Sequence, residues 1–369
     1  MKFLHTGDLH IGKTVNEFSM LEDQKHILQQ ILGIAVKEQV DAVVIAGDVY
    51  DRPIPSTEAV ELLDEFLTAF MEKKIPVIMI SGNHDSGERV AFADRILEKQ
   101  GLYIAGGYDR ELKRVLFEDE WGNVDFVCMP FVKPAVATVE DMLGRTPMAF
   151  DLRTRHVLVT HYFVTGENGE TPEISDAETA VNVGGLDNIA ADSFAMFDYV
   201  ALGHIHKRQK IGAREVWYAG APLKYSFSEV NHVKSVNLVT LGEKGDVRVE
   251  KRDLTPLHEM RVIRGELEVL ISPEVVQAAP ADDYIKAVLT NEEALIDPIG
   301  TLRSVYPNVM QIEPSKREIE EQNEYTSEVF TKQKSIGELF GDFYEMLKGE
   351  PMDEKRENLV AELEKRIEG

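Results

Sequence analysis

Five short polar motifs contain the residues of this chain best suited to chemistry. They combine carboxylates, histidines and one asparagine: Asp8-Leu9-His10, Gly47-Asp48-Val49-Tyr50-Asp51, Gly82-Asn83-His84-Asp85, His161 and Gly203-His204-Ile205-His206. Oxygen and imidazole ligands without sulfur suit Mn²⁺ or Fe²⁺, with Zn²⁺ as a further option, whereas Mg²⁺ sites rarely contain so many histidines. Together the motifs predict a centre for two divalent metal ions.

The spacing of these donors indicates how two cations would share them. Asp8 and His10 are two residues apart, close enough to reach one cation, and His206 would complete that site. Asp48 can bridge both cations because a carboxylate has two oxygens. The second cation would be held by Asp48, Asn83, His161 and His204. Positions remain open for water and substrate.

Two cations roughly 3.5–4 Å apart are typical of enzymes that cleave phosphate esters, because they lower the pKa of water and clamp the oxygens on phosphorus during in-line attack. Hydroxide is then available near neutral pH. The leaving oxygen needs a proton, and His84, next to Asn83, is positioned to supply it. Asp51 lies one helical turn after Asp48 and could pair with His84 to hold it protonated. We therefore expect His84 and Asp51 to be the catalytic residues.

Each motif follows a short apolar run, and these runs must position the chemistry. Residues 3–6, 42–46, 77–80, 157–160 and 199–202 are rich in Val, Ile and Leu without alternation. That pattern is typical of strands buried on both faces of a helix-covered sheet. Functional groups gather at the carboxyl ends of strands in open α/β sheets, so five distant loops can meet in one cleft. Amphipathic helices that would cover the sheet are expected over residues 23–37 and from about Ser56 onwards, where Val60, Leu63, Leu67 and Phe70 would form the apolar stripe.

Three further segments follow the region that carries the motifs, residues 1–255. Residues 256–312 have the pattern of a small α/β module without metal motifs, suited to substrate selection. Residues 313–334 are charged and Glu-rich, as linkers are. Residues 335–369 contain two amphipathic helical patterns separated by Lys348-Gly349-Glu350-Pro351. Such a hairpin either folds back on the body or offers a face to another protein.

Length and composition narrow the class of protein. The chain has 369 residues, of which 43% are apolar, enough for two or three domains. No apolar run reaches the roughly 20 residues that cross a membrane, and the first residues make a poor signal peptide. We therefore expect a soluble cytoplasmic protein without membrane contact. The single Cys128 excludes an intrachain disulfide and a thiolate cluster, and is expected in the core.

The charge balance leaves the substrate open. Forty Lys and Arg against 65 Asp and Glu give a net charge of −25, whereas proteins that bind nucleic acid by themselves usually have a basic surface. Either the substrate is not a polymer, or metals and a basic partner supply positive charge. A stand-alone metallophosphatase or nucleotide phosphodiesterase would share every ligand and fit the acidity. A scaffold without activity would be expected to lack a ligand or His84, and all are present.

In this order, the five motifs resemble those of the calcineurin-like metallophosphoesterase superfamily. Three longer stretches narrow the resemblance to the SbcD family of bacterial nuclease subunits, relatives of the Mre-eleven nucleases: His5 to Lys13, Ala46 to Asp51, and Tyr218 to Glu229. The resemblance implies an α/β fold, a four-layer αββα metallophosphoesterase sandwich with a small α/β capping domain and a C-terminal helical hairpin. It also implies that Tyr225, Phe227 and Glu229 contact DNA or the cap.

The resemblance further implies an activity and partners. Enzymes of this family use two Mn²⁺ ions for 3′ to 5′ exonuclease action on double-stranded DNA and for endonuclease action on single strands and hairpins. Their partner, the SbcC ATPase, would bind the hairpin near residues 335–367, gate access to DNA through ATP, and supply basic DNA contacts in DNA repair, recombination and replication. A homodimer within a heterotetramer is expected. Archaeal and eukaryotic relatives have His at the position of Asp51, so this chain departs from them there.

Overall fold

The computed structural model describes residues 1–133, 136–146, 153–166, 169–178, 188–293 and 295–314, together with the single positions 344, 356 and 360. Apart from residues 313 and 314 and those three positions, the expected linker and helical hairpin lie outside the described residues. In the described part of the chain, every helix is too short or too polar to cross a membrane.

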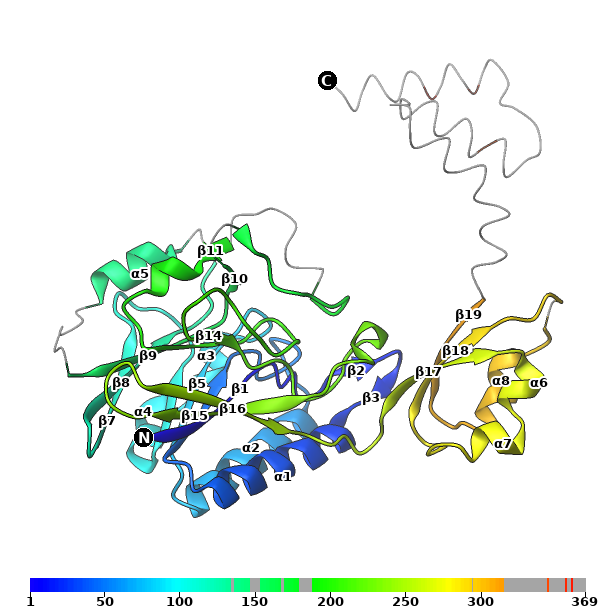
Figure 1. The fold of residues 1–369 in the computed structure, drawn as a ribbon, viewed down its shortest axis with the longest axis horizontal. Coiled ribbons are helices and arrows are strands. Elements are labelled where there is room, and N and C mark those ends of the chain that lie inside the picture. Colours follow the sequence, from blue (N-terminus) through cyan, green and yellow to red (C-terminus); the bar gives the residue numbers. More distant parts are fainter. Residues whose placement is uncertain are drawn as a thin grey trace.

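The first sheet carries three of the five motif-bearing strands. Its order is β16-β15-β1-β4-β5-β6 (Figure 1). The parallel strands are β1 (Lys2–Thr6), β4 (Ala42–Ala46), β5 (Val77–Ile80) and β6 (Leu102–Ala105). The antiparallel strands β15 (Ser235–Leu241) and β16 (Val247–Asp253) extend the sheet on the far side of β1. Strands β4 and β5 are buried along their whole length, as their unbroken apolar runs predict.

The second sheet carries the other two motif-bearing strands, β9 and β12. Its order is β13-β14-β12-β9-β8-β7. The strands are β7 (Lys113–Asp119), β8 (Gly122–Met129), β9 (Arg155–Thr160), β12 (Tyr199–Leu202), β13 (Gln209–Lys210) and β14 (Val216–Tyr218). Side chains from both sheets meet in one core, where the ring of Phe3 in β1 packs edge-on against Phe126 at 5.2 Å and Tyr199 at 5.7 Å. Cys128 is buried in this core, as expected.

Helices cover the outer faces of both sheets. α1 (Leu21–Glu38) and α2 (Thr57–Glu72) pack on the first sheet, and α5 (Val139–Arg145) packs on the second with the 3₁₀ turn η3 (Ala191–Phe194). Ser56 caps α2 by accepting a hydrogen bond from the amide of Ala59. The expected four-layer αββα sandwich is therefore confirmed.

The loops of the sandwich contain short helices and strands. They are β2 (Thr14–Val15), β3 (Phe18–Ser19), α3 (Gly87–Val90), α4 (Asp94–Leu97), η1 (Glu98–Gln100), β10 (Phe163–Thr165), β11 (Asn188–Ala190) and η4 (Phe227–Glu229). β2 pairs with β3, and β10 pairs with β11.

The smaller module forms a parallel sheet with its own core, drawn beside the sandwich in Figure 1. Its strands are β17 (Met260–Gly265), β18 (Tyr284–Leu289) and β19 (Val309–Pro314), and its helices are α6 (Leu267–Leu270), α7 (Pro273–Val276) and α8 (Pro298–Arg303). Met260, Tyr284 and Met310 join the core that packs under α1 and α2. The module is thus fastened to the sandwich by apolar side chains.

Candidate metal centre

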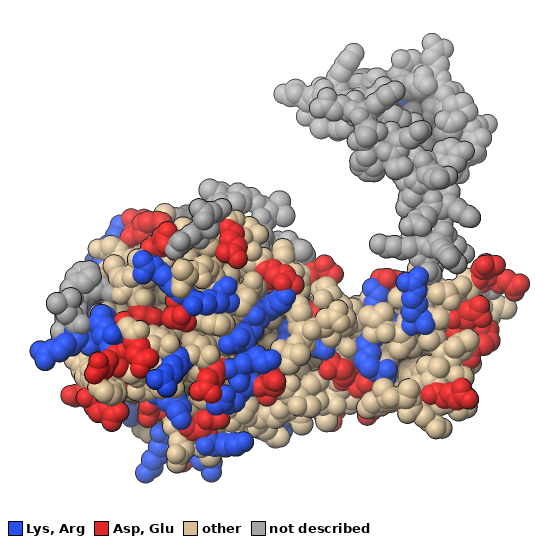
Figure 2. Space-filling view, in the orientation of Figure 1, with Lys and Arg blue, Asp and Glu red and all other residues tan. Residues whose placement is uncertain are grey.

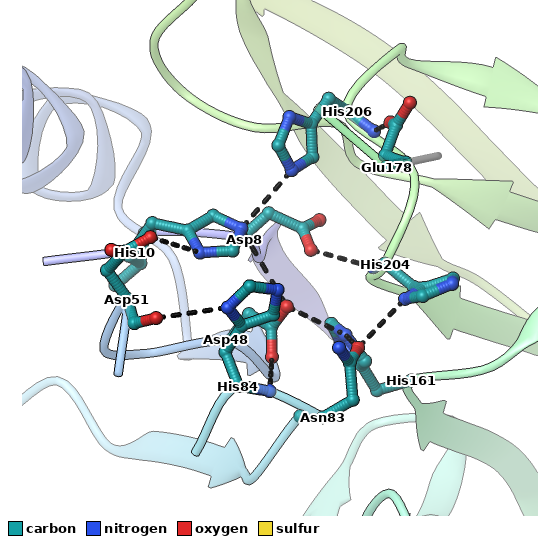
Figure 3. Close-up of polar contacts among 12 residues, drawn as sticks. Asp8, His10, Asp48, Asp51, Asn83, His84, His161, Glu178, His204 and His206 are labelled. Atoms are coloured by element: carbon teal, nitrogen blue, oxygen red, sulfur yellow. Dashed lines mark hydrogen bonds and ion pairs between the residues drawn. The ribbon is translucent and has the colours of Figure 1, made fainter. Parts of the chain in front are cut away.

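All the residues expected to do chemistry meet at the carboxyl ends of strands from both sheets (Figure 3). Asp8 and His10 follow β1, Asp48 and Asp51 follow β4, Asn83 and His84 follow β5, His161 follows β9, and His204 and His206 follow β12. Main-chain hydrogen bonds tie the first two loops together, since the amide of Asp8 donates to Gly47 and that of His10 to Asp48. The stacking of the two sheets therefore creates the cluster.

The first group of donors consists of Asp8, His10 and His206. Their donor atoms lie within 4.8 Å of one another, and the Nε2 atoms of the two histidines are 3.2 Å apart. Oδ1 of Asp8 accepts from the amide of His204, but the buried Oδ2 has no hydrogen-bond partner. A buried carboxylate oxygen without a partner is costly. A cation among these three side chains would satisfy it, so the donor set fits a metal.

The second group lies around Asp48. Oδ2 of Asp48 is 3.2 Å from Nε2 of His161, and Oδ1 of Asn83 lies 3.0 Å from that nitrogen and 2.9 Å from Nδ1 of His204. Nδ1 of His161 donates to the carbonyl of Ala46 at 2.8 Å, which leaves Nε2 as the ligand atom. Asp8, Asp48 and His161 also form a compact donor group, so the two candidate sites adjoin.

Four of these donors have a strained backbone. Asp8, His10, Asp48 and His204 have positive φ angles of 52°, 45°, 47° and 96°. Left-handed backbone is uncommon for residues other than glycine, and such strain clusters at functional sites. The turns aim side chains from successive loops into one space, at a conformational cost that the surrounding packing must offset.

The glycines that precede the donors allow this close approach. A Cβ on Gly82 would lie 2.1 Å from Oδ1 of Asp48, and a Cβ on Gly203 would lie 1.9 Å from the carbonyl oxygen of Ala46. Both distances are too short for any side chain. The Gly-Asn-His and Gly-His sequences thus reflect packing of one loop against another.

Burial and neighbouring charges shift the pKa values of the cluster in opposite directions. Burial raises the pKa of Asp8 to about 7, and lowers that of His10 to about 4 and that of His204 to about 3. Burial also opposes protonation of His161, but the adjacent Asp48 outweighs it and raises the pKa of His161 to about 9. A cation would relieve the cost of burying Asp8 as a carboxylate, and neutral His10 and His204 have the lone pairs that metal binding requires.

His84 lies beside the donors, and its partner differs from the one the sequence predicts. Its Nδ1 contacts the main-chain carbonyl oxygen of Asp51 at 3.0 Å, not the carboxylate. The Asp51 carboxylate instead accepts from Nζ of Lys13 at 2.6 Å and lies 3.6 Å from Nδ1 of His10. The expectation that this carboxylate holds His84 protonated is therefore corrected. His84 also forms a compact donor group with His10 and Asp48.

Comparison with known proteins identifies the family. A model described as calcineurin-like phosphoesterase matches residues 1–208, and one described as Type 5 capsule protein repressor C-terminal domain matches residues 256–347. The SbcD subunit of the SbcCD nuclease from Staphylococcus epidermidis is 32% identical over 378 residues, covering 98% of each chain. Its namesake from Staphylococcus saprophyticus is 32% identical over 328 residues, covering 85% of this chain and 84% of its own.

The chain belongs to the SbcD family of calcineurin-like phosphoesterases. It is accordingly a metal-dependent phosphoesterase, and the family resemblance predicted from the motifs is confirmed. Among solved structures, the protein TT1561 of Thermus thermophilus is similar at 10% identity with a TM-score of 0.39, over 68% of this chain and 98% of that one.

Two carboxylates of this SbcD family member were missed as parts of the centre. Asp85 accepts hydrogen bonds from the amides of Val49, Tyr50 and Gly82, and so pins the second and third motif loops together. Glu229 is fully buried and contacts Nδ1 of His206, which the sequence does not predict, while its 3₁₀ turn η4 lies against β17 of the small module, as the resemblance implies. The role of Asp85 could have been predicted, because Asp85 lies within a motif. Glu229 has no fixed sequence spacing to His206 from which its contact could have been predicted.

Proposed function

We propose that this chain is the nuclease subunit of an SbcCD-type complex and hydrolyses DNA phosphodiester bonds at a centre of two Mn²⁺ ions. The observation that supports this most directly is the set of three overlapping donor groups, in which Asp8, His10 and Asp48 each belong to two groups and His206, His161 and His84 each complete one. Mixed oxygen and imidazole donors without sulfur suit Mn²⁺; Fe²⁺ and Zn²⁺ are the alternatives.

In the proposed assignment, one cation is held by Asp8, His10, Asp48 and His206, and the other by Asp48, Asn83, His161 and His204. When bound, the two cations supply Lewis acidity that lowers the pKa of water and neutralises charge on the phosphate. The main-chain carbonyl of Asp51 can only accept, so Nδ1 of His84 carries a proton and Nε2 remains to exchange one. As attack breaks the phosphorus–oxygen bond, the imidazolium of His84 gives its Nε2 proton to the leaving oxygen.

We propose the organisation and partners of the family for this chain as well. Residues 1–255 would form the nuclease domain, 256–312 the capping domain, 313–334 a linker, and 335–369 a hairpin that binds the SbcC ATPase. The separate core of the small module, which includes Leu267, Ile285 and Val309, supports a boundary between the nuclease and capping domains. ATP bound to SbcC would gate DNA access.

A second copy of the chain would complete a homodimer within a heterotetramer with SbcC. Ile54, Phe92 and Ile96 support this, because these apolar side chains flank the motif loops in sequence and are 69%, 80% and 70% exposed. Against DNA, the proposed activities are 3′ to 5′ exonuclease action on duplexes and endonuclease action on single strands and hairpins.

The test is Mn²⁺-dependent cleavage of end-labelled duplex and hairpin DNA by the purified chain, beside a small phosphodiester and a phosphomonoester. We expect DNA degradation that is lost in His84→Ala while metal content stays unchanged. Robust hydrolysis of the small esters with intact DNA would instead indicate a stand-alone metallophosphatase or nucleotide phosphodiesterase. Loss of metal in His84→Ala would contradict the assignment of His84 as a proton donor rather than a ligand.

A further inference from the structure

A groove of about 450 Å³ has His206, one donor of the candidate metal centre, in its lining. Its walls come from the segment after His206, from the 219–221 turn, from the 228–235 segment and from β16. The groove shares residues 231–234 with a second depression that reaches the seam with the 256–314 module. The groove therefore adjoins the candidate metal centre at His206, where a chain-like ligand could extend from one to the other.

The groove is basic in a chain of net charge −25. Lys207, Arg208 and Lys251 line it, with Glu173 as the single carboxylate of the lining. A fourth cation of the lining, Lys234, is buried and paired with Glu229. Figure 2 shows Lys and Arg side chains gathered in the middle of the face drawn, over the region where Figure 1 draws β14 to β16. An acidic protein that concentrates cations in a concave surface favours an anionic ligand there.

Arg208 is held in place with its terminal nitrogens open. Its guanidinium stacks 4.5 Å from the ring of Trp217, and its Nε donates to Oδ1 of Asn237, which is fully buried. Among the described residues, these are its only fixed partners within hydrogen-bonding or stacking distance. A guanidinium fixed on one side and open on the other is suited to bidentate recognition of a phosphate.

Two polar atoms in the same groove lack partners. Oγ of Ser235 is buried without a hydrogen bond, in a residue that is only 2% exposed. Nδ1 of His232, on the turn that both depressions share, is likewise buried and unpaired. Buried polar groups are nearly always hydrogen-bonded, so these two unpaired atoms mark the floor of the groove as polar rather than apolar.

We propose that this groove binds backbone phosphates of the DNA strand whose scissile bond lies in the metal centre. Arg208 binds one phosphate, and Lys207 and Lys251 contribute charge at the rim. Lys207 now pairs with Glu173 and Lys251 with Asp253, and both pairs are solvent-exposed enough to exchange their carboxylate for a phosphate. This inference rests on the proposed nuclease function and adds where the substrate lies.

The test measures binding of a labelled single-stranded oligonucleotide to the full chain by fluorescence anisotropy, over a series of salt concentrations. Ca²⁺ replaces Mn²⁺, and a gel verifies that the oligonucleotide stays intact. The variants are Arg208→Lys, which keeps the charge but loses the fork, and Lys207→Ala/Lys251→Ala. The matched control is Lys25→Ala/Lys37→Ala on α1, where Lys25 also forms a surface ion pair, with Glu65. Mn²⁺-dependent hydrolysis of a small phosphodiester reports on the metal centre.

We expect Arg208→Lys to weaken binding about tenfold. Lys207→Ala/Lys251→Ala should reduce the slope of log affinity against log salt by about 1.4, since each lost phosphate contact on a single strand removes about 0.7. Hydrolysis of the small ester should not change in either variant. The control should bind like the parent chain.

Groove variants that bind DNA like the control would overturn the inference and leave the nuclease function intact. If deoxyadenosine monophosphate or inorganic phosphate displaced the oligonucleotide at comparable phosphate concentrations, the groove would be a site for free phosphates, which also overturns it. A parent chain that hydrolyses the small ester but neither binds nor cuts DNA would refute the proposed function, and the groove's assignment to DNA with it.

Discussion

Nδ1 of His206 lies 3.2 Å from Oε1 of Glu229, and this contact fixes which nitrogen of the imidazole faces the metal centre. An ionised carboxylate can only accept, so Nδ1 carries the proton and Nε2 keeps its lone pair, 3.2 Å from Nε2 of His10. Glu229 is itself held, because its Oε2 accepts from Nζ of Lys234 at 2.5 Å and its Oε1 from Ser175 at 3.1 Å. These bonds outweigh burial and lower the pKa of Glu229 to about 2.

Glu229→Gln should therefore weaken Mn²⁺ binding by about 10- to 100-fold, because the carboxylate behind a histidine ligand fixes its tautomer and raises its basicity. Isothermal titration calorimetry with Mn²⁺ measures this directly. Glu259→Gln is the matched control, since Glu259 also pairs with a lysine, Lys224 at 2.6 Å, but touches no donor of the centre. Equal Mn²⁺ affinities for the two variants would contradict the role of Glu229.

Asp51→Asn tests whether the main-chain carbonyl of residue 51 or its side-chain carboxylate supports His84 in catalysis. The asparagine keeps the main-chain carbonyl that contacts Nδ1 of His84, and the carboxylate lies 3.6 Å from His10, beyond hydrogen-bond distance. We expect Asp51→Asn to lose about tenfold in turnover at most, and His84→Ala to lose about 10²- to 10⁴-fold. The measurement is the rate of ester hydrolysis at saturating Mn²⁺. An equally large loss of rate in both variants would show that the Asp51 carboxylate takes part in catalysis.

Glycine substitutions test how tightly the motif loops pack. In Gly82→Ala the new Cβ would meet Oδ1 of Asp48 at 2.1 Å and its amide nitrogen at 2.4 Å, so the second motif loop must shift. We expect loss of Mn²⁺ binding together with a lower melting temperature. Gly33→Ala on α1 has no neighbour within 4 Å of the new Cβ and should stabilise the fold by about 0.5–1 kcal/mol through helix propensity. Metal titration and thermal unfolding of both variants provide the comparison.

The fold could be predicted because its signals are local. Runs such as residues 42–46 and 77–80 are apolar at every position, which only strands covered on both faces require, and each ends at a polar loop. Helix phase was less secure. In α2, Leu63 and Phe70 of the expected stripe are buried, but Val60 is 45% exposed, and the stripe omitted the buried Ala59, Leu62 and Phe66. Neighbouring residues of a helix point about 100° apart, so the centre of the buried face is hard to locate from the sequence where apolar residues are adjacent.

The site could be predicted only as far as its motifs extend. Donors at strand ends have recognisable types and spacing, but the partner of His84 turned out to be a main-chain carbonyl, which no side-chain pattern encodes. Glu229 reaches His206 from a different loop, so the pair has no fixed spacing. Such contacts depend on how the loops after β12 and β14 fold against each other, and sequence patterns do not specify that.

Asp125 in β8 should make the free energy of unfolding fall measurably at acid pH. Burial opposes its ionisation, but hydrogen bonds from His156 at 3.2 Å and from Arg114 at 2.5 and 3.1 Å outweigh this and hold the pKa of Asp125 below its ordinary value. A depressed folded-state pKa means stability that is present above the unfolded pKa of about 3.9 and is lost as the pH falls through the folded pKa.

We expect Asp125→Asn to cost about 1–3 kcal/mol at neutral pH, and the difference from the parent chain to shrink as the pH falls below about 4. Urea unfolding at a series of pH values measures it. Asp141→Asn is the control, because the Asp141 carboxylate accepts its hydrogen bonds from Thr138 at the exposed start of α5. If the difference in unfolding free energy between the parent chain and Asp125→Asn stayed constant at all pH values down to acid unfolding, Asp125 would not be the source of the pH dependence.

Asp23 of α1 fastens the small module to the sandwich. Its Oδ2 accepts from the hydroxyl of Tyr284 at 2.8 Å and from Nδ1 of His258 at 2.9 Å, and its Oδ1 accepts from the amide of His258 at 2.9 Å. The carboxylate is fully buried at this junction. Tyr284→Phe keeps the packing and removes one donor, so we expect it to cost about 1.5–3 kcal/mol, as hydrogen bonds to charged groups do.

Tyr284→Phe should also affect only one part of the chain. Hydrogen exchange of amides in residues 254–260 and at the start of β18 should quicken, while the strands of the sandwich keep their protection, because only the junction is loosened. Tyr306→Phe is the matched control, since its hydroxyl bonds Leu270 inside the module and away from the junction. Faster exchange spread evenly over both bodies, or no change at residues 254–260, would mean that the hydrogen bond to Asp23 does not help to hold the module on the sandwich.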